Sequence, residues 1–81
     1  MRPINLAPNT TIRVPEQGYR FGTGPLTLTI TEVVASEVAD GKVWVRLKGR
    51  EIRPDWSVAP RERFAEVRLD LVTEIEPVRV R

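Results

Sequence analysis

The stretch LTLTIT, residues 26–31, decides the fold class, because its leucines and its isoleucine alternate strictly with threonines. A period of two puts the aliphatic side chains on one face of a β-strand and the threonines on the other. One buried face and one wet face are typical of a strand in an antiparallel sheet. We therefore predict a β-strand here and an all-β fold around it.

Two other stretches repeat this alternation. In VWVRLK, residues 43–48, aliphatic residues alternate with an aromatic residue and two cations, and in AEVRLDL, residues 65–71, they alternate with charged residues. Shorter strands are expected at residues 10–14 and 18–22, and the alternating residues 78–81 either pair with the sheet or fray as a tail. The aliphatic face of these strands predicts a core of Ile12, Val14, Leu26, Leu28, Ile30, Val43, Val45, Leu47, Val67, Leu69 and Leu71.

Turn signals separate the strands. Asp40-Gly41 is a strong signal for a two-residue hairpin turn. Such a turn pairs Val38 with Val43, but an uninterrupted ladder would then put Glu32 on the buried face. A bulge near Val33–Val34, or a loop over residues 35–41, would remove this conflict. Two prolines in residues 53–61 argue against a central strand there.

The number and length of the strands indicate the architecture. Five to six short strands with short connections predict a small antiparallel barrel or sandwich, SH3-like or OB-like. A length of 81 residues fits one domain. We expect residues 1–81 to form that domain, with an ordered core over about residues 10–76.

Three segments also carry a resemblance. The run YRFGTGPLTLTIT (residues 19–31), the strand VWVRLKG (residues 43–49) and the strand EVRL (residues 66–69) together resemble a group of short uncharacterised actinomycete proteins. The shared features are structural: an aromatic residue, two glycines and an alternating strand. The resemblance implies no activity.

Composition excludes the common kinds of catalytic site. The chain has no cysteine and no histidine, so thiol nucleophiles, histidine bases and the usual zinc ligands are missing. Glu66 and Asp70 are about 13 Å apart along one strand, too far for a directly cooperating pair. We predict a protein that is not an enzyme, with no cofactor and no metal. The missing cysteines favour a cytoplasmic location, and no segment resembles a signal peptide or a membrane span.

Basic residues are concentrated in the middle of the chain. The whole chain has 13 basic and 11 acidic residues, whereas residues 42–63 contain seven basic and three acidic ones. In this region Trp44, Arg46, Lys48 and Arg50 fall on the outward face of one strand. An aromatic residue beside aligned cations suits base stacking with phosphate contacts, and it equally suits a protein interface. Alternatively, Trp44 packs against the acidic strand while the cations pair with Glu66 and Asp70.

Two further aromatic residues belong to the candidate binding patch. Trp56, in the proline-bounded loop, either folds back over the core or presents its indole to a partner. Tyr19, if exposed, would widen the aromatic surface. The leading prediction is a non-enzymatic protein-interaction or accessory module that binds a protein partner or itself. The alternative is a nucleic-acid-binding barrel, and a small-molecule ligand is not expected because so small a barrel is filled by its own side chains.

Overall fold

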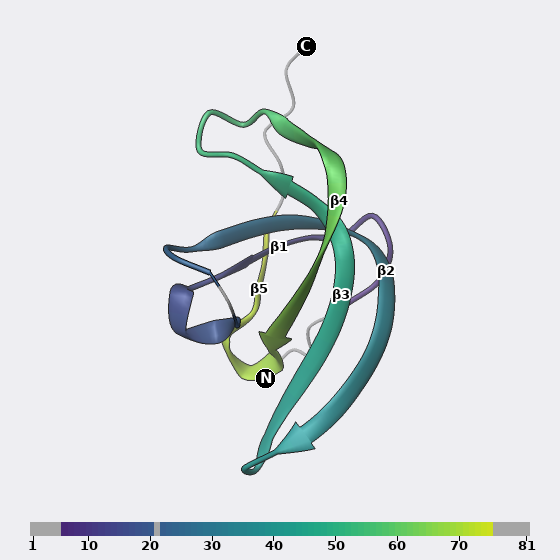
Figure 1. Ribbon diagram of the computed structural model, residues 1–81, viewed down its shortest axis with the longest axis vertical. Helices are drawn as coiled ribbons and strands as arrows, with labels where there is room; N and C mark the ends of the chain where they lie inside the picture. The colour runs from purple at the N-terminus through teal and green to yellow at the C-terminus, as the bar shows by residue number, and fades with distance from the viewer. Residues whose placement is uncertain (1–5, 21, 76–81) are drawn as a thin grey trace.

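The computed structural model describes residues 6–20 and 22–75, and its strands form one antiparallel sheet (Figure 1). In chain order the elements are β1 (Thr11–Val14), η1 (Glu16–Gly18), β2 (Leu26–Ala39), β3 (Lys42–Ile52), β4 (Val58–Arg68), η2 (Leu69–Leu71) and β5 (Thr73–Ile75), where η denotes one turn of 3-10 helix. The strand order in the sheet is β4-β3-β2-β1-β5. The all-β prediction is confirmed, but among the described residues the sheet does not close into a barrel. No helix in this part of the chain is long and apolar enough to cross a membrane.

The β2–β3 hairpin closes at the predicted turn. Asp40 and Gly41 both have positive φ, 53° and 75°, as a type I′ turn requires. Val38 pairs with Val43, as predicted. The ladder then shifts between Val33 and Ala35 and again between Ile30 and Glu32. Glu32 thereby pairs with Lys48 instead of entering the core, so the predicted bulge near Val33–Val34 is confirmed.

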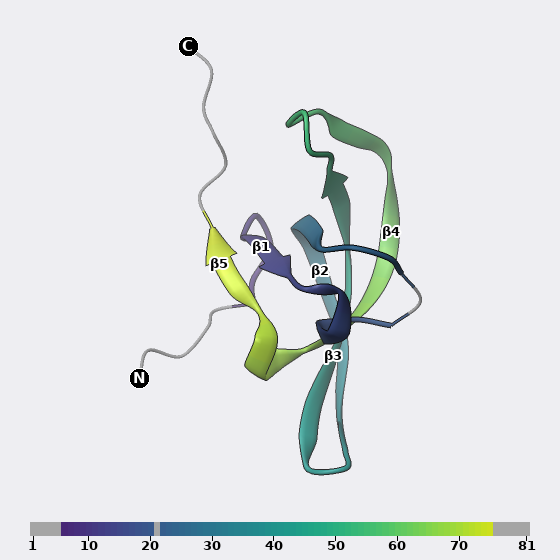
Figure 2. The same cartoon turned by 90° about the vertical axis from the view of Figure 1, so that its left-hand side faces the viewer.

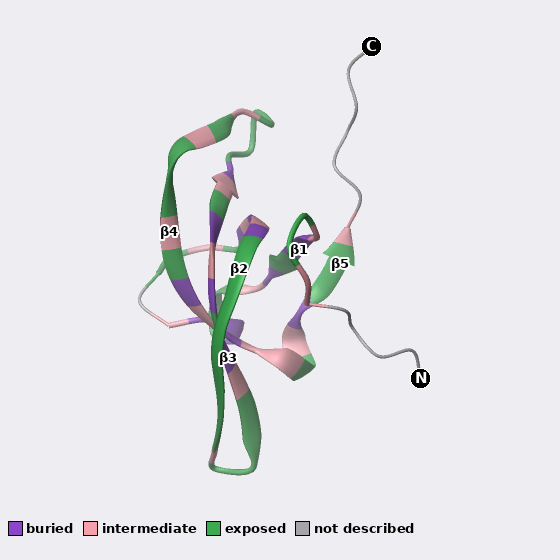
Figure 3. Ribbon diagram, turned by 90° about the vertical axis from the view of Figure 1, so that its right-hand side faces the viewer, coloured by how far each residue is buried: buried purple, intermediate pink, exposed green. Residues whose placement is uncertain are grey.

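The two bulges coincide with a bend that divides β2 into two parts. Bulges bend the strand that contains them, and β2 curves through this region in Figure 1. The first part pairs with β1 on one side and with β3 on the other, whereas the second part pairs with β3 alone. We call residues 31–43, the distal part of the hairpin, the arm. It extends beyond the rest of the described chain (Figure 2), and all its residues are exposed except the half-buried Ala39 (Figure 3).

The core lies against the concave side of the sheet. Its buried residues are Ile12, Val14, Tyr19, Leu26, Leu28, Ile30, Val45, Leu47, Ala65, Val67 and Val72. Most of the predicted core is confirmed, with three corrections. Leu69 is only half-buried, although it packs against the core. Val43 is 37% exposed because it lies on the arm. Val72 is buried while Leu71 is only half-buried, because η2 interrupts the alternation that the sequence predicted to continue to Leu71.

Close contact between β2 and β3 depends on a glycine. Gly49 is buried and pairs with Ile30. A Cβ atom at Gly49 would overlap the backbone oxygen of Thr29, far inside van der Waals contact. A side chain here would therefore push the two strands apart in the middle of the core.

Other predicted elements need correction. In the segment 18–22, the described residues 18–20 and 22 belong to no strand, and Tyr19 makes an isolated bridge to Val67 of β4. The strand predicted over residues 65–71 ends at Arg68. The irregular segment predicted over residues 53–61 is shorter than expected, since β4 already includes Pro60; β4 is an edge strand, where proline is tolerated. The alternating residues 78–81 lie outside the described residues.

Candidate interaction surface

The outer face of β3 and β4 contains most of the predicted binding patch. Trp44, Arg46 and Lys48 alternate along β3 with the buried Val45 and Leu47. Across the ladder they pair with Arg68, Glu66 and Phe64 of β4, in that order. The prediction that these three β3 side chains share one outward face is consistent with this alternation, and the same face also contains acidic and aromatic residues from β4.

Trp44 is covered on one side by this chain's own arginine. The Arg20 guanidinium carbon lies 4.3 Å from the centre of the indole ring, within the range of a cation–π interaction. Arg20 also pairs with the Glu66 carboxylate at 3.2 Å, and its backbone N–H donates to the Glu66 carbonyl oxygen at 3.1 Å. Trp44 is half-buried. The cations that pair with Glu66 and Asp70 are Arg20 and Arg68, not the β3 cations that the alternative interpretation expected.

Phe64 was not in the predicted patch, although it lies in the middle of this face. Its side chain is 56% exposed. The Arg46 guanidinium carbon and the Lys48 ammonium nitrogen lie 5.6 and 5.8 Å from the centre of its ring. Phe64 precedes the buried Ala65 and alternates with it, so it shares a face of the strand with Glu62 and Glu66. That alternation, read from the sequence, could have placed the ring on the outer face.

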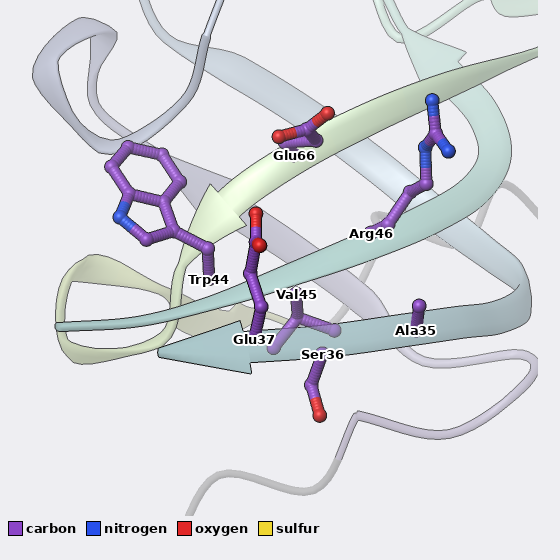
Figure 4. A pocket seen from close by; sticks show the side chains of 7 residues that line it. All are labelled: Ala35, Ser36, Glu37, Trp44, Val45, Arg46 and Glu66. Atoms are coloured by element: carbon purple, nitrogen blue, oxygen red, sulfur yellow. The ribbon is translucent and has the colours of Figure 1, made fainter. Parts of the chain in front are cut away.

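A shallow hollow of about 290 Å³ lies between Trp44 and Arg46 (Figure 4). The carboxylates of Glu37 and Glu66 extend into the region between these two side chains. Arg46, like Lys48 and Arg50, forms none of the ion pairs seen among the described residues. The face is therefore electrostatically mixed, with unpaired cations beside acidic groups, and is not a continuous basic surface.

Of the other three predicted patch residues, Arg50 continues the outer face along β3, whereas Tyr19 and Trp56 lie elsewhere. Arg50 is exposed and pairs with Glu62 farther along β3. Tyr19 is buried, with 8% of its surface exposed, and its hydroxyl donates to the carbonyl oxygen of Gly24 at 2.8 Å. Tyr19 is therefore part of the core and adds no aromatic surface to the patch.

Trp56 lies at the far end of β3 from Trp44. Trp44 and Ile52 are eight residues apart on one strand, about 27 Å, and Trp56 follows in the turn beyond Ile52. Its side chain is 48% exposed and absent from the core cluster, so it does not cover the core. It lines a separate groove of about 310 Å³ together with Arg13, Pro25, Thr27, Glu51, Ile52, Arg53 and Pro54.

Hydrogen bonds hold the turn around Trp56. The Asp55 carboxylate accepts from the Ser57 N–H at 2.9 Å and from the Ser57 hydroxyl at 2.6 Å. These bonds lower the pKa of Asp55 from its ordinary value of 3.8. At the other end of β4 the Arg68 guanidinium donates two hydrogen bonds to Asp70, at 2.7 and 3.2 Å, which lower the pKa of Asp70 in the same way.

The arm contains four exposed valines. Val33, Val34, Val38 and Val43 are 40%, 42%, 72% and 37% exposed. Core packing ends at Val45, which is 4% exposed, and beyond it the hairpin continues with apolar side chains that no described element covers. The sequence predicted Val43 as a core residue and left the other three valines between the expected bulge and the turn, so it identified none of them as a surface.

The residues described here contain no group of acidic side chains arranged to hold a metal ion. The chain matches no protein-family model, no curated protein and no solved structure.

Proposed function

We propose that this protein is a non-enzymatic protein-interaction module and that the arm is its binding element. The exposed valines of the arm carry this proposal. Four valines between 37% and 72% exposed lie together on one hairpin, in a chain whose thin core needs its apolar side chains. Contiguous apolar surface on a soluble domain typically marks a contact with another protein.

The rest of the fold anchors one end of the arm. β3 runs from the arm into the core, where Leu47 is fully buried, so one end of the hairpin is anchored. We include in the proposal an SH3-like or OB-like closure of the sheet. It is supported by the bridge between Tyr19 and Val67 and by the hydrogen bond from Arg20 to Glu66 at the outer edge of β4. The absence of cysteine from the sequence is consistent with a cytoplasmic location.

Site-specific photo-crosslinking in the source cells tests the proposal. A photoreactive amino acid replaces Val38 on the arm, and in a matched variant it replaces Gln17, which is exposed in η1 away from the arm. We expect a discrete protein–protein crosslink from position 38 and none of the same size from position 17. The proposal is wrong if position 38 gives no crosslink, or if it gives only crosslinks that position 17 gives as well.

One observation favours a second candidate, a nucleic-acid-binding surface on the outer face. The charged groups of Arg46 and Lys48 lie 5.6 and 5.8 Å from the centre of the exposed Phe64 ring. An aromatic ring flanked by cations suits base stacking. Glu62 and Glu66 on the same strand oppose the approach of phosphates. Fluorescence anisotropy with mixed-sequence single-stranded DNA and RNA decides this. If the face binds, Phe64→Ala weakens binding by about 1–3 kcal/mol per stacked base, and affinity falls steeply with salt.

A further inference from the structure

One edge of the arm has no strand beside it within residues 6–20 and 22–75. β1 pairs with β2 only from Leu26 to Thr29, and the segment before β1 makes the last bonds, to Ile30. There the Ile30 N–H donates to the Thr10 carbonyl oxygen at 2.8 Å. Beyond that point no described residue pairs with β2 on this side, so the edge from Glu32 to Ala39 is open.

The register shows which backbone groups this open edge presents. In a two-residue hairpin the residues flanking the turn, here Ala39 and Lys42, form a hydrogen-bonded pair. Hydrogen-bonded and non-hydrogen-bonded pairs then alternate along the ladder. The N–H and C=O groups of Val38 and Ser36 therefore point away from β3, toward the open edge. They are free to pair with another strand.

The open edge lacks the protection that the other edges have. The outer edge of β4 includes Pro60 and is met at Glu66 by Arg20, and β5, at the opposite side, is only three residues long. Proline, charge and short length are the usual means of preventing edge-to-edge pairing. The arm edge has eight residues without proline, and Glu32 and Glu37 are its only charged residues.

We propose that a second copy of this chain pairs with this edge, antiparallel, with the two-fold axis at Ser36. The proposal rests on the arm being a protein-binding element, and it identifies the partner. In this register Val34 of each copy lies opposite Val38 of the other, and Ala35 lies opposite Glu37. Apolar cross-strand pairs stabilise a sheet, and like charges directly opposite each other destabilise it.

Neighbouring registers are less favourable on the same grounds. An axis at Glu37 would set the two Glu37 carboxylates opposite each other, and an axis at Ala35 would set Val38 opposite Glu32. The axis at Ser36 avoids both conflicts within the strand and centres the pairing on a residue whose backbone groups point outward; Glu32 falls opposite Asp40, which lies in the turn beyond the end of β2. The five-stranded sheets of the two copies would then form one continuous sheet.

Cysteine crosslinking tests this register directly, because the natural chain has no cysteine. Across the proposed axis the two Cα atoms of residue 36 are about 5.5 Å apart, within the range that a disulfide spans. The matched control is Lys42→Cys, exposed on the other strand of the arm. Lys42 pairs with Ala39, which is three residues from the axis. The two copies of residue 42 are therefore offset by six residues, about 20 Å along the strands.

At about 10 µM protein under mild oxidation, Ser36→Cys should form disulfide-linked dimer roughly a hundredfold faster than Lys42→Cys, because pairing raises the local thiol concentration to the millimolar range. Sedimentation supplies a second measurement without cysteine. Ser36→Pro, which removes an N–H from the open edge, should sediment as a monomer at concentrations where wild type and Ser36→Thr sediment as dimers.

The proposal is overturned if Ser36→Cys crosslinks no faster than Lys42→Cys, or if Ser36→Pro dimerises as wild type does. If the photoreactive group at Val38 then captures a different protein, the arm is a protein-binding element and only the identity of the partner is wrong. If position 38 captures nothing, the proposed function fails as well.

Discussion

Truncating one arm valine and one core valine to alanine separates a binding role for the arm from a folding role. Val67 is fully buried and Val38 is 72% exposed. Val67→Ala removes two buried methyl groups, worth about 0.8 kcal/mol each, and leaves a cavity whose cost brings the total to about 2–3 kcal/mol. Val38→Ala removes groups that are already mostly in water, so it should cost only about 0.5 kcal/mol.

The assay is urea unfolding followed by tryptophan fluorescence at low protein concentration, where self-association is negligible. Trp44 reports on folding because it is half-buried under Arg20. The midpoint of Val38→Ala should stay near that of wild type, and the midpoint of Val67→Ala should fall clearly. Equal losses at low concentration would refute the reasoning, because they would show that Val38 packs within a single copy.

Three further predictions concern the rest of the sheet. Trp44→Ala should destabilise the fold by about 1–2 kcal/mol more than Trp56→Ala in urea unfolding, because only Trp44 loses burial and a cation–π contact; equal losses would show that Trp56 also packs on the core. Gly49→Ala should cost more than about 2 kcal/mol, because its Cβ would overlap the Thr29 backbone oxygen, and an unchanged midpoint would contradict that close approach. Arg68 lowers the pKa of Asp70, so the stabilising contribution of Asp70 should be complete above the unfolded pKa of about 3.8 and be lost as the pH falls through the lower folded pKa. The stability of Asp70→Asn should therefore depend less steeply on pH over that range in acid unfolding. An acid-unfolding curve identical to that of wild type would count against the pairing of Arg68 with Asp70.

The sequence predicted the local structure well wherever alternation and turn chemistry agree. LTLTIT and VWVRLK are strands, and Asp40-Gly41 closes their hairpin. The bulge near Val33–Val34 could be predicted because an unbroken ladder would have buried Glu32. Each of these inferences needs only neighbouring residues and the cost of burying a charge.

The extent of the core could not be read from alternation. A period of two shows which face of a strand is apolar, but not how far along the strand another element covers that face. β1 pairs with β2 over only four residues, so Val38 and Val43 remain outside the core although they continue its apolar face. The exposed arm is a consequence of tertiary structure.

Long-range contacts also determined the candidate surface. Arg20 reaches Trp44 and Glu66 because the segment after β1 crosses to the edge of β4, a path that no local pattern specifies. Tyr19 enters the core by the same path. The separation of Trp44 from Trp56 follows from the length of β3, which places the two indoles at opposite ends of one strand.

Amide hydrogen exchange in the arm tests the central claim, that its open edge is where another chain pairs. The Glu37 N–H points toward β3 and should be protected at every protein concentration, whereas the Ser36 and Val38 N–H groups point outward. We predict that the Ser36 and Val38 amides exchange rapidly in dilute protein and slow markedly as the concentration rises. Rapid exchange of both amides at every concentration, with Glu37 still protected, would contradict pairing of the arm with a second copy.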